Sequence, residues 1–275
     1  MTLIISMCTK HGTFMIADSL ITEYFEDGTS KPCYNTEKIF VLPNSKTAIS
    51  FWGAVNNPKT KFDLFSELDL IKKELSPFTE RYGIATITDK LLKMLPKLNI
   101  DQDDELGFHV TGYDHHTPRL NHVFHAKFLE KREFINEDAT CQAHEGFIGR
   151  HGYKKISFSM PFPMLFNGDL RSPSIILKGL SAFGDYVDYE NLTKERAKEF
   201  LIFLMDFAIG LQNFSEDSRT KGALIGYPLS FVELIDGSSP SISFISQPTT
   251  VSKSRFFTSF GDAVKDSGGK PKDVQ

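Results

Sequence analysis

Three short pieces of sequence at the N-terminus decide the fold: MTLIISM (residues 1–7), KHG (residues 10–12) and TFMIADS (residues 13–19). The first and last pieces are apolar runs, and the middle one contains a glycine. Two apolar runs on either side of such a turn are typical of a β-hairpin. We therefore predict two strands within residues 2–22, the first of which starts directly behind the initiator methionine.

The second residue, Thr2, has the chemistry of a nucleophile. A methionine followed by a small residue is usually removed in cells, which would leave Thr2 with a hydroxyl and a free α-amine. A threonine hydroxyl is a poor nucleophile until a base takes its proton, and a terminal amine can be that base. The unperturbed pKa of such an amine is roughly 7.7–8.0, so a neutral fraction exists near physiological pH.

Further pieces of sequence extend this N-terminal pattern, and they are GTFMIADS (12–19), Thr22, EKI (37–39) and FWGA (51–54). Together with TLII at residues 2–5, they resemble the N-terminal half of a proteasome β-type subunit, a member of the N-terminal-nucleophile hydrolases. The resemblance implies that Thr2 is the nucleophile, with Asp18 and Lys38 as its charged support. It also implies that Thr22 binds the substrate backbone and that the Gly53 amide lies at the oxyanion hole.

The resemblance continues near the C-terminal end of the chain. An Asp-x-x-Ser-x-Gly element supports the nucleophile's amine in the family, and here the matching residues are Asp217 and Thr220. It further implies an αββα fold, in which two antiparallel sheets form a sandwich with helices on both outer faces. The order of hairpins, helices, hairpins, a long helix and a last strand is itself an α+β order.

The leading function is therefore an N-terminal threonine hydrolase, a peptidase that works through an acyl-enzyme without a cofactor. Two departures from the family favour a second reading, a catalytically inactive structural or binding subunit. Leu20 occupies the position where the family commonly has arginine, and Asp169 stands where it has serine. A third reading keeps the enzyme but makes it a small-molecule amidase of the same superfamily. For Asp18 and Lys38 the plain alternative is a structural ion pair.

Composition narrows the possible partners. The chain has 275 residues and a formal net charge of −4, so without a basic stripe a nucleic-acid partner is not expected. The sequence contains no run of about 18 apolar residues, so we predict no membrane span. Three cysteines, Cys8, Cys33 and Cys141, are few and odd in number, which favours a reducing cytoplasm over a disulfide framework. We expect a peptide or protein substrate and, by analogy with the family, a homo-oligomer.

The rest of the chain suggests one large domain. Apolar residues recur at helical spacing in residues 58–75 and 193–212, and Thr193 suits the N-cap of the second helix. We expect a further helix over residues 89–95 with Thr88 as its cap, and a loop or irregular ribbon over residues 22–36. Residues 1–245 are predicted to form the domain, with an elaboration at about 128–163 whose elements we could not predict. Residues 246–275 are a tail of disordered composition.

Histidines between residues 109 and 151 raise the question of a metal site. His115 and His116 are adjacent, and His122 and His125 differ by three positions, which places the latter two on opposite faces of a strand. Zinc needs three or four convergent ligands, and no acidic partner has convincing spacing. We therefore predict surface histidines and no metal site.

Overall fold

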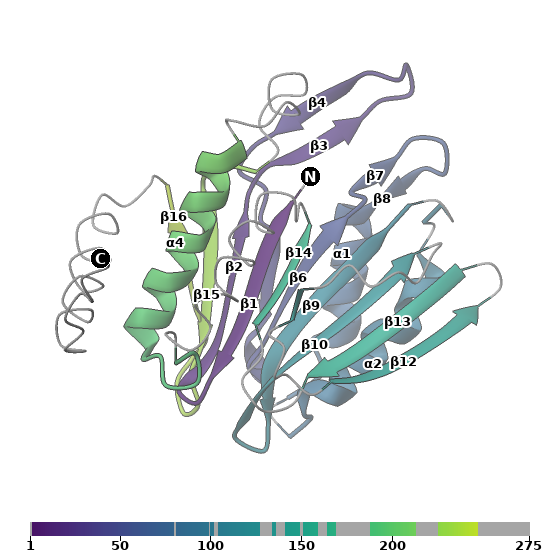
Figure 1. Ribbon diagram of the computed structural model, residues 1–275. Helices are drawn as coiled ribbons and strands as arrows, with labels where there is room; N and C mark the ends of the chain where they lie inside the picture. The colour runs from purple at the N-terminus through teal and green to yellow at the C-terminus, as the bar shows by residue number, and fades with distance from the viewer. Residues whose placement is uncertain are drawn as a thin grey trace, which may run out of the picture.

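The computed structural model describes most of the chain. The described residues are 2–79, 81–98, 100–101, 104–126, 134–135, 141–148, 151–158, 164–168, 188–212 and 225–246. They form a mixed α/β fold in which every described strand pair is antiparallel. Two six-stranded sheets make up its centre (Figure 1).

The first sheet is built around the predicted N-terminal hairpin. Its strands, in order across the sheet, are β11 (Phe134–Ile135), β14 (Met164–Gly168), β1 (Leu3–Thr9), β2 (Gly12–Asp18), β15 (Leu229–Leu234) and β16 (Ser241–Ile245). Every residue of β1 and β2 is buried. Because both faces of this hairpin are covered, its strands carry continuous apolar runs instead of a strict alternation.

The second sheet contains most of the middle of the chain. Its strands, in order, are β12 (Cys141–Ile148), β13 (His151–Phe158), β10 (Thr117–Ala126), β9 (Leu106–Asp114), β6 (Thr47–Gly53) and β5 (Ile39–Leu42). The segment at about 128–163, whose elements the sequence did not reveal, thus contributes β12 and β13 to the edge of this sheet and β11 to the edge of the first.

Two small hairpins lie beside the main sheets. The first pairs β3 (Ile21–Tyr24) with β4 (Ser30–Cys33), so residues 22–36, where a loop or irregular ribbon was expected, contain most of a regular two-stranded ribbon. This hairpin projects beyond the body of the molecule (Figure 1). The second pairs β7 (Asn56–Asn57) with β8 (Phe62–Asp63).

Helices pack against both sheets. Residues of α1 (Leu64–Leu75) and α2 (Ile84–Met94) share an apolar cluster with the second sheet, and residues of α4 (Lys194–Gln212) share one with the first. Two short 3₁₀ helices, Pro43–Ser45 and Leu95–Lys97, complete the described elements. Among the described residues, no helix has both the length and the apolar character to cross a membrane.

The helix ends agree only partly with those predicted from the sequence. The Thr193 hydroxyl accepts a hydrogen bond from the Arg196 amide at 3.4 Å, as expected of an N-cap. The second helix, however, begins at Ile84 and not at Asp89. Thr88 lies inside it, and its hydroxyl donates to the Ile84 carbonyl at 2.7 Å, so the expected cap at Thr88 was wrong.

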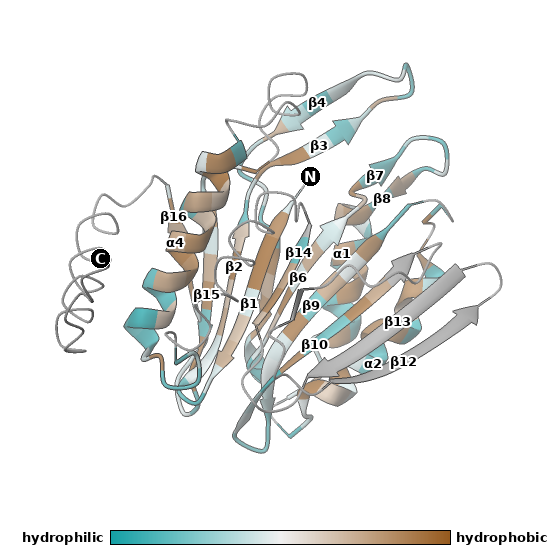
Figure 2. Ribbon diagram, in the orientation of Figure 1, coloured by the Kyte–Doolittle hydropathy of each residue, from teal (hydrophilic) through white to brown (hydrophobic). Residues whose placement is uncertain are grey.

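The two sheets face each other through a third apolar cluster. It includes Ile4 and Met15 from the first sheet, and Trp52 and Leu120 from the second. Figure 2 shows the hydrophobic colouring of the strands at the centre of the molecule. Because side chains alternate along a strand, Ile4 points into the intersheet space while its neighbours Leu3 and Ile5 belong to the cluster that contains α4. The division into one domain of residues 1–245 stays a prediction, and the tail from residue 247 onward lies outside the described residues.

Candidate active site

Thr2 lies at the entrance to the intersheet space. It directly precedes β1 and is 5% exposed. Thr2, Ile4 and Ser6 are two residues apart along extended backbone, so their side chains share the face that points toward the second sheet. The hydroxyl that the sequence singled out therefore lies on the wall of a space between two sheets.

Asp18 and Lys38 form a fully buried ion pair beside this position. Lys38 Nζ lies 2.8 Å from Asp18 Oδ1, and both side chains are 0% exposed. The same Oδ1 accepts a hydrogen bond from the backbone N–H of Leu3 at 2.9 Å. The predicted pair is thus present, and it is bonded directly to the residue that follows the candidate nucleophile.

The backbone of Leu20 completes this ion pair. Its N–H donates to Asp18 Oδ2 at 3.1 Å, and its carbonyl oxygen accepts from Lys38 Nζ at 2.5 Å. The Leu20 side chain is 1% exposed and part of the core. The sequence drew attention to the charge that Leu20 lacks, but could not reveal these two main-chain contacts.

Burial sets the electrostatics of the pair. It lowers the pKa of Lys38 from its ordinary value because a buried cation loses its hydration, and Asp18 opposes that shift through its charge and hydrogen bond. A buried charge of this kind persists only with a partner. The two residues consequently depend on each other.

A pocket of about 1200 Å³ opens at Thr2. Thr22 on β3 and Gly53 at the end of β6 lie on its wall, so three of the predicted site residues meet there. The rest of the wall comes from Ile21, Tyr24, Phe25, Glu26, Gly28, Trp52, Ala54, Val55, Asn56, Asn57, Pro58, Lys59, Asp101, Asp104, Glu105 and Asn167.

Gly53 has a backbone conformation that excludes other residues. Its φ is +99°, and a Cβ there would lie 2.1 Å from the carbonyl oxygen of Glu105. Side chains rarely tolerate this φ, and none fits at that distance. The glycine lets the main chain of β6 pass close to β9 at the pocket wall.

The remaining predicted site residues, Asp217 and Thr220, lie outside the described residues, as does Asp169. Their predicted roles therefore stay predictions.

The structure also reveals a buried polar network that the sequence did not suggest. His109 Nδ1 lies 2.8 Å from Ser6 Oγ, and His109 Nε2 lies 2.5 Å from Asn167 Oδ1. Trp52 Nε1 donates to His122 Nε2 at 3.0 Å. Trp52 and Asn167 line the pocket, so the network extends from the pocket wall into the intersheet core.

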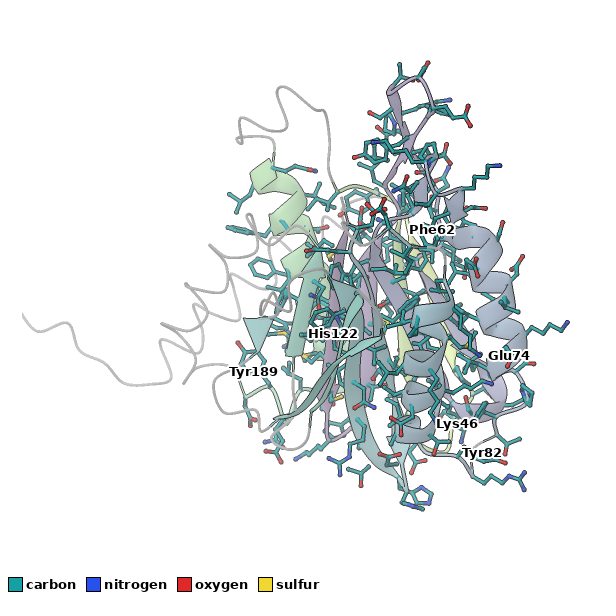
Figure 3. The ribbon with its side chains drawn as sticks, turned by 90° about the vertical axis from the view of Figure 1, so that its right-hand side faces the viewer. Lys46, Phe62, Glu74, Tyr82, His122 and Tyr189 are labelled. Atoms are coloured by element: carbon teal, nitrogen blue, oxygen red, sulfur yellow. The ribbon has the colours of Figure 1, made fainter. Side chains whose placement is uncertain are left out.

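His122 corrects the prediction of surface histidines. It is 1% exposed and pairs across β9 and β10 with His109, which is 0% exposed; Figure 3 shows His122 in the interior of the molecule. A signal was present, since His122 and Leu120 share a strand face and the latter is apolar. His116, by contrast, is exposed and bonds Asp236 at 2.7 Å. In the described part of the chain, no three His, Cys, Asp or Glu side chains gather as metal ligands.

Cys8 is not a reactive thiol in this environment. It is fully buried, and burial raises its pKa to about 12. Since thiolate is the reactive form, Thr2 is the better nucleophile candidate of the two.

Comparison with solved structures supports a proteasome-like fold. An Anbu Gly-1 mutant from Hyphomicrobium sp. strain MC1 is similar over 100% of both chains, with a TM-score of 0.56 and 13% sequence identity. Anbu from Pseudomonas aeruginosa, described as a helical assembly of the Anbu complex, has the same TM-score and identity over 99% of this chain and 98% of that one. No family model and no curated protein matches the sequence. Anbu is proteasome-related, so the likeness relates this fold to proteasome-like proteins, and at such low identity it concerns the fold alone.

Proposed function

We propose that this protein is an N-terminal threonine hydrolase that cleaves peptide amide bonds through an acyl-enzyme on Thr2, after removal of Met1. One observation carries the proposal. Thr2 lines a large pocket, and the buried Asp18–Lys38 pair binds the amide of the next residue, Leu3. A buried ion pair adjacent to a potential nucleophile in a pocket is a recognised mark of an active site.

The reaction follows from the chemistry of Thr2. Its α-amine, directly or through a water molecule, takes the hydroxyl proton as Oγ1 attacks the scissile carbonyl carbon. The Gly53 N–H stabilises the resulting oxyanion, and loss of one such donor costs other enzymes about 3–4 kcal/mol. The C–N bond then breaks, and the ammonium of Thr2 gives its proton to the leaving amine. Water hydrolyses the ester and regenerates the free hydroxyl.

Other residues assist this cycle. The positive charge of Lys38 disfavours protonation of the nearby α-amine, which makes that amine a better base. Asp18 holds Lys38 in place, and Thr22 binds the substrate backbone. Asp217 and Thr220 support the amine. The cycle uses no metal ion or organic cofactor.

The proposal extends to the fold and the assembly. We assign the chain to a four-layer αββα sandwich formed by residues 1–245, with the second sheet enlarged at about 128–163. The helical assembly described for Pseudomonas Anbu supports a homo-oligomer here as well. Cytoplasmic residence agrees with the small number of cysteines, three in 275 residues.

A matched pair of variants tests the hydrolase. Thr2→Ser keeps a hydroxyl beside the α-amine, whereas Thr2→Val keeps the shape of threonine and removes the hydroxyl. We expect wild-type protein and Thr2→Ser to release aminocoumarin from a panel of peptidyl aminocoumarin amides, and Thr2→Val to release none. Activity restricted to single amino-acid amides would indicate the amidase. Equal rates for Thr2→Val and wild type would overturn the proposal, and no turnover by folded wild-type protein would favour the inactive subunit.

A further inference from the structure

The pocket at Thr2 is lined by more acidic than basic side chains. Its described wall contains four acidic residues and one basic residue, which are Glu26, Asp101, Asp104, Glu105 and Lys59. With a volume of about 1200 Å³, the pocket has room for several residues of a peptide. The side chains of a bound peptide would therefore meet this negative wall, and their charge would affect the affinity.

The Thr2 hydroxyl identifies the pocket as a place for a ligand. Thr2 is 5% exposed, and its hydroxyl has no hydrogen-bond partner among the described residues. Buried polar groups normally have such a partner, so this hydroxyl is available to a bound molecule. The negative wall therefore belongs to a site with its own polar contact and is more than a patch of surface charge.

Asp104 carries a charge that no described residue balances in an ion pair. Its Oδ2 accepts a hydrogen bond from Asn57 Nδ2 at 2.6 Å, and Asn57 Oδ1 accepts one from the Lys59 N–H at 3.0 Å. The second bond fixes the Asn57 amide so that Nδ2 faces Asp104. Since an amide is neutral, the first bond holds the carboxylate in place and leaves its negative charge uncompensated.

Glu26 adds a second carboxylate from the β3–β4 hairpin, and it too forms no ion pair with a described residue. Two hydrogen bonds attach this hairpin to β7: the Tyr24 N–H donates to Asn56 Oδ1 at 3.1 Å, and Asn56 Nδ2 donates to the Tyr24 carbonyl at 2.7 Å. Figure 1 shows β3 and β4 near β7 and β8. Asn56 directly precedes Asn57, the residue that holds Asp104. The two carboxylates are thus anchored to the same short strand.

Two aromatic rings precede Glu26 on the same wall. Tyr24 and Phe25 are 54% and 45% exposed, and both line the pocket. An aromatic face attracts a cation, and the aliphatic part of an arginine or lysine side chain packs on apolar surface while its charged end stays with polar groups. Aromatic rings together with unpaired carboxylates therefore suit a basic side chain better than an apolar or an acidic one.

We propose that this pocket selects peptides with a basic side chain, and that Glu26 and Asp104 bind its cation. The inference rests on the proposed function, because it names the substrate class of the same site. Arginine is the better ligand of the two basic residues, since its planar guanidinium offers several N–H donors and stacks on an aromatic ring. Lys59 opposes the effect through its own positive charge.

Arginine and citrulline provide a matched pair of ligands. The two side chains have the same shape, but citrulline is neutral. Two acetylated and amidated alanine peptides that differ only in one central arginine or citrulline therefore isolate the charge. We expect the arginine peptide to bind about tenfold more tightly at low salt, since each exposed ion pair usually contributes about two- to fivefold. In about 1 M salt the ratio should fall to about twofold, because the charges are screened.

The pocket contains its own reporter of binding. Trp52 is the single tryptophan of the chain, and it lines the pocket. Its fluorescence can therefore follow the binding of a peptide without any turnover. The Thr2→Val protein is the suitable background, because it retains the shape of the site and does not consume the ligand.

Variants that each remove one charge test the named carboxylates. In this background, Glu26→Gln and Asp104→Asn should each weaken binding of the arginine peptide about two- to fivefold and leave binding of the citrulline peptide unchanged. Asp104→Asn keeps an oxygen that accepts from Asn57, so the contact with β7 is retained. Asp69→Asn is the matched control, since it removes the same charge from an exposed position of α1 outside the pocket wall. It should change neither dissociation constant.

Lys59→Gln should have the opposite effect and bind the arginine peptide about twofold more tightly. Equal affinities for the arginine and citrulline peptides, or tighter binding of a glutamate peptide, would overturn the inference and leave the hydrolase intact. An arginine preference that survives the double change Glu26→Gln/Asp104→Asn would overturn the role of these two carboxylates. Turnover by wild type tests the hydrolase separately, so the two failures are distinguishable; a background protein that binds neither peptide overturns the inference whatever that turnover is.

Discussion

Replacing Lys38 with methionine removes the buried charge and almost nothing else. Methionine has a similar length, and the lysine stem is packed in a site with 0% exposure. The change leaves the Asp18 carboxylate without its cation and the Leu20 carbonyl without its donor at 2.5 Å. Removal of one member of a buried pair typically costs about 3–5 kcal/mol.

The contacts of Asp18 place the expected loss of stability in Lys38→Met at the lower end of that range. Asp18 keeps two backbone donors, the N–H groups of Leu3 and Leu20 at 2.9 and 3.1 Å, so its charge is not left wholly unsatisfied. We expect the free energy of unfolding to fall by about 3 kcal/mol. The double variant Asp18→Asn/Lys38→Met has no buried charge and should recover part of this loss; recovery stays incomplete because asparagine has one acceptor oxygen for the two N–H groups of Leu3 and Leu20.

Urea unfolding followed by Trp52 fluorescence measures both values. A loss below about 1 kcal/mol for Lys38→Met, or a double variant as unstable as the single one, would contradict the reasoning. A peptide hydrolysis assay distinguishes the effect of these variants on activity from their effect on stability. The double variant should remain folded yet inactive, because the charge that favours the neutral α-amine of Thr2 is gone.

Three further predictions concern single positions. Gly53→Ala should lower the free energy of unfolding by about 2–3 kcal/mol in urea, because of its positive φ and the collision with Glu105; a loss under about 0.5 kcal/mol would contradict the assigned backbone. The free energy of unfolding should fall as the pH drops below about 6.5. Burial lowers the pKa of His109 in the folded protein, so in this range the histidine binds a proton only after unfolding. At pH 5.5 the loss approaches about 1.4 kcal/mol. If wild type and His109→Gln had the same pH dependence of stability between 5.5 and 7.5, this prediction would be refuted. Cys8 should resist alkylation by iodoacetamide at pH 8 in the folded protein, because its pKa is raised to about 12; peptide mass mapping that finds it modified before unfolding would contradict its burial.

The sequence predicted those features that depend on neighbours along the chain. The hairpin of β1 and β2 follows from two apolar runs around Gly12, and the long helix follows from its periodicity and its cap at Thr193. The start of α2 was placed too late, because Thr88 suits both a cap and a helix interior. In the structure its hydroxyl bonds the carbonyl of Ile84.

The site was predictable only where a family pattern fixed the spacing. Asp18 and Lys38 are twenty positions apart, yet they lie 2.8 Å apart in the structure, as the resemblance implied. The contact of His109 with Asn167 joins residues 58 positions apart on different sheets. No local pattern marks such a pair, because the apolar neighbours on a strand face can indicate that a histidine is buried but not which distant residue it contacts.

The most direct test of the central claim is the intact mass of native, untagged protein before and after incubation with a peptide epoxyketone. This electrophile forms its stable ring product only with a hydroxyl and an adjacent free amine. We expect a protein that lacks Met1 and gains a single adduct, with no adduct on Thr2→Val. A protein that retains Met1 and gains no adduct would contradict the claim that Thr2 is an N-terminal nucleophile.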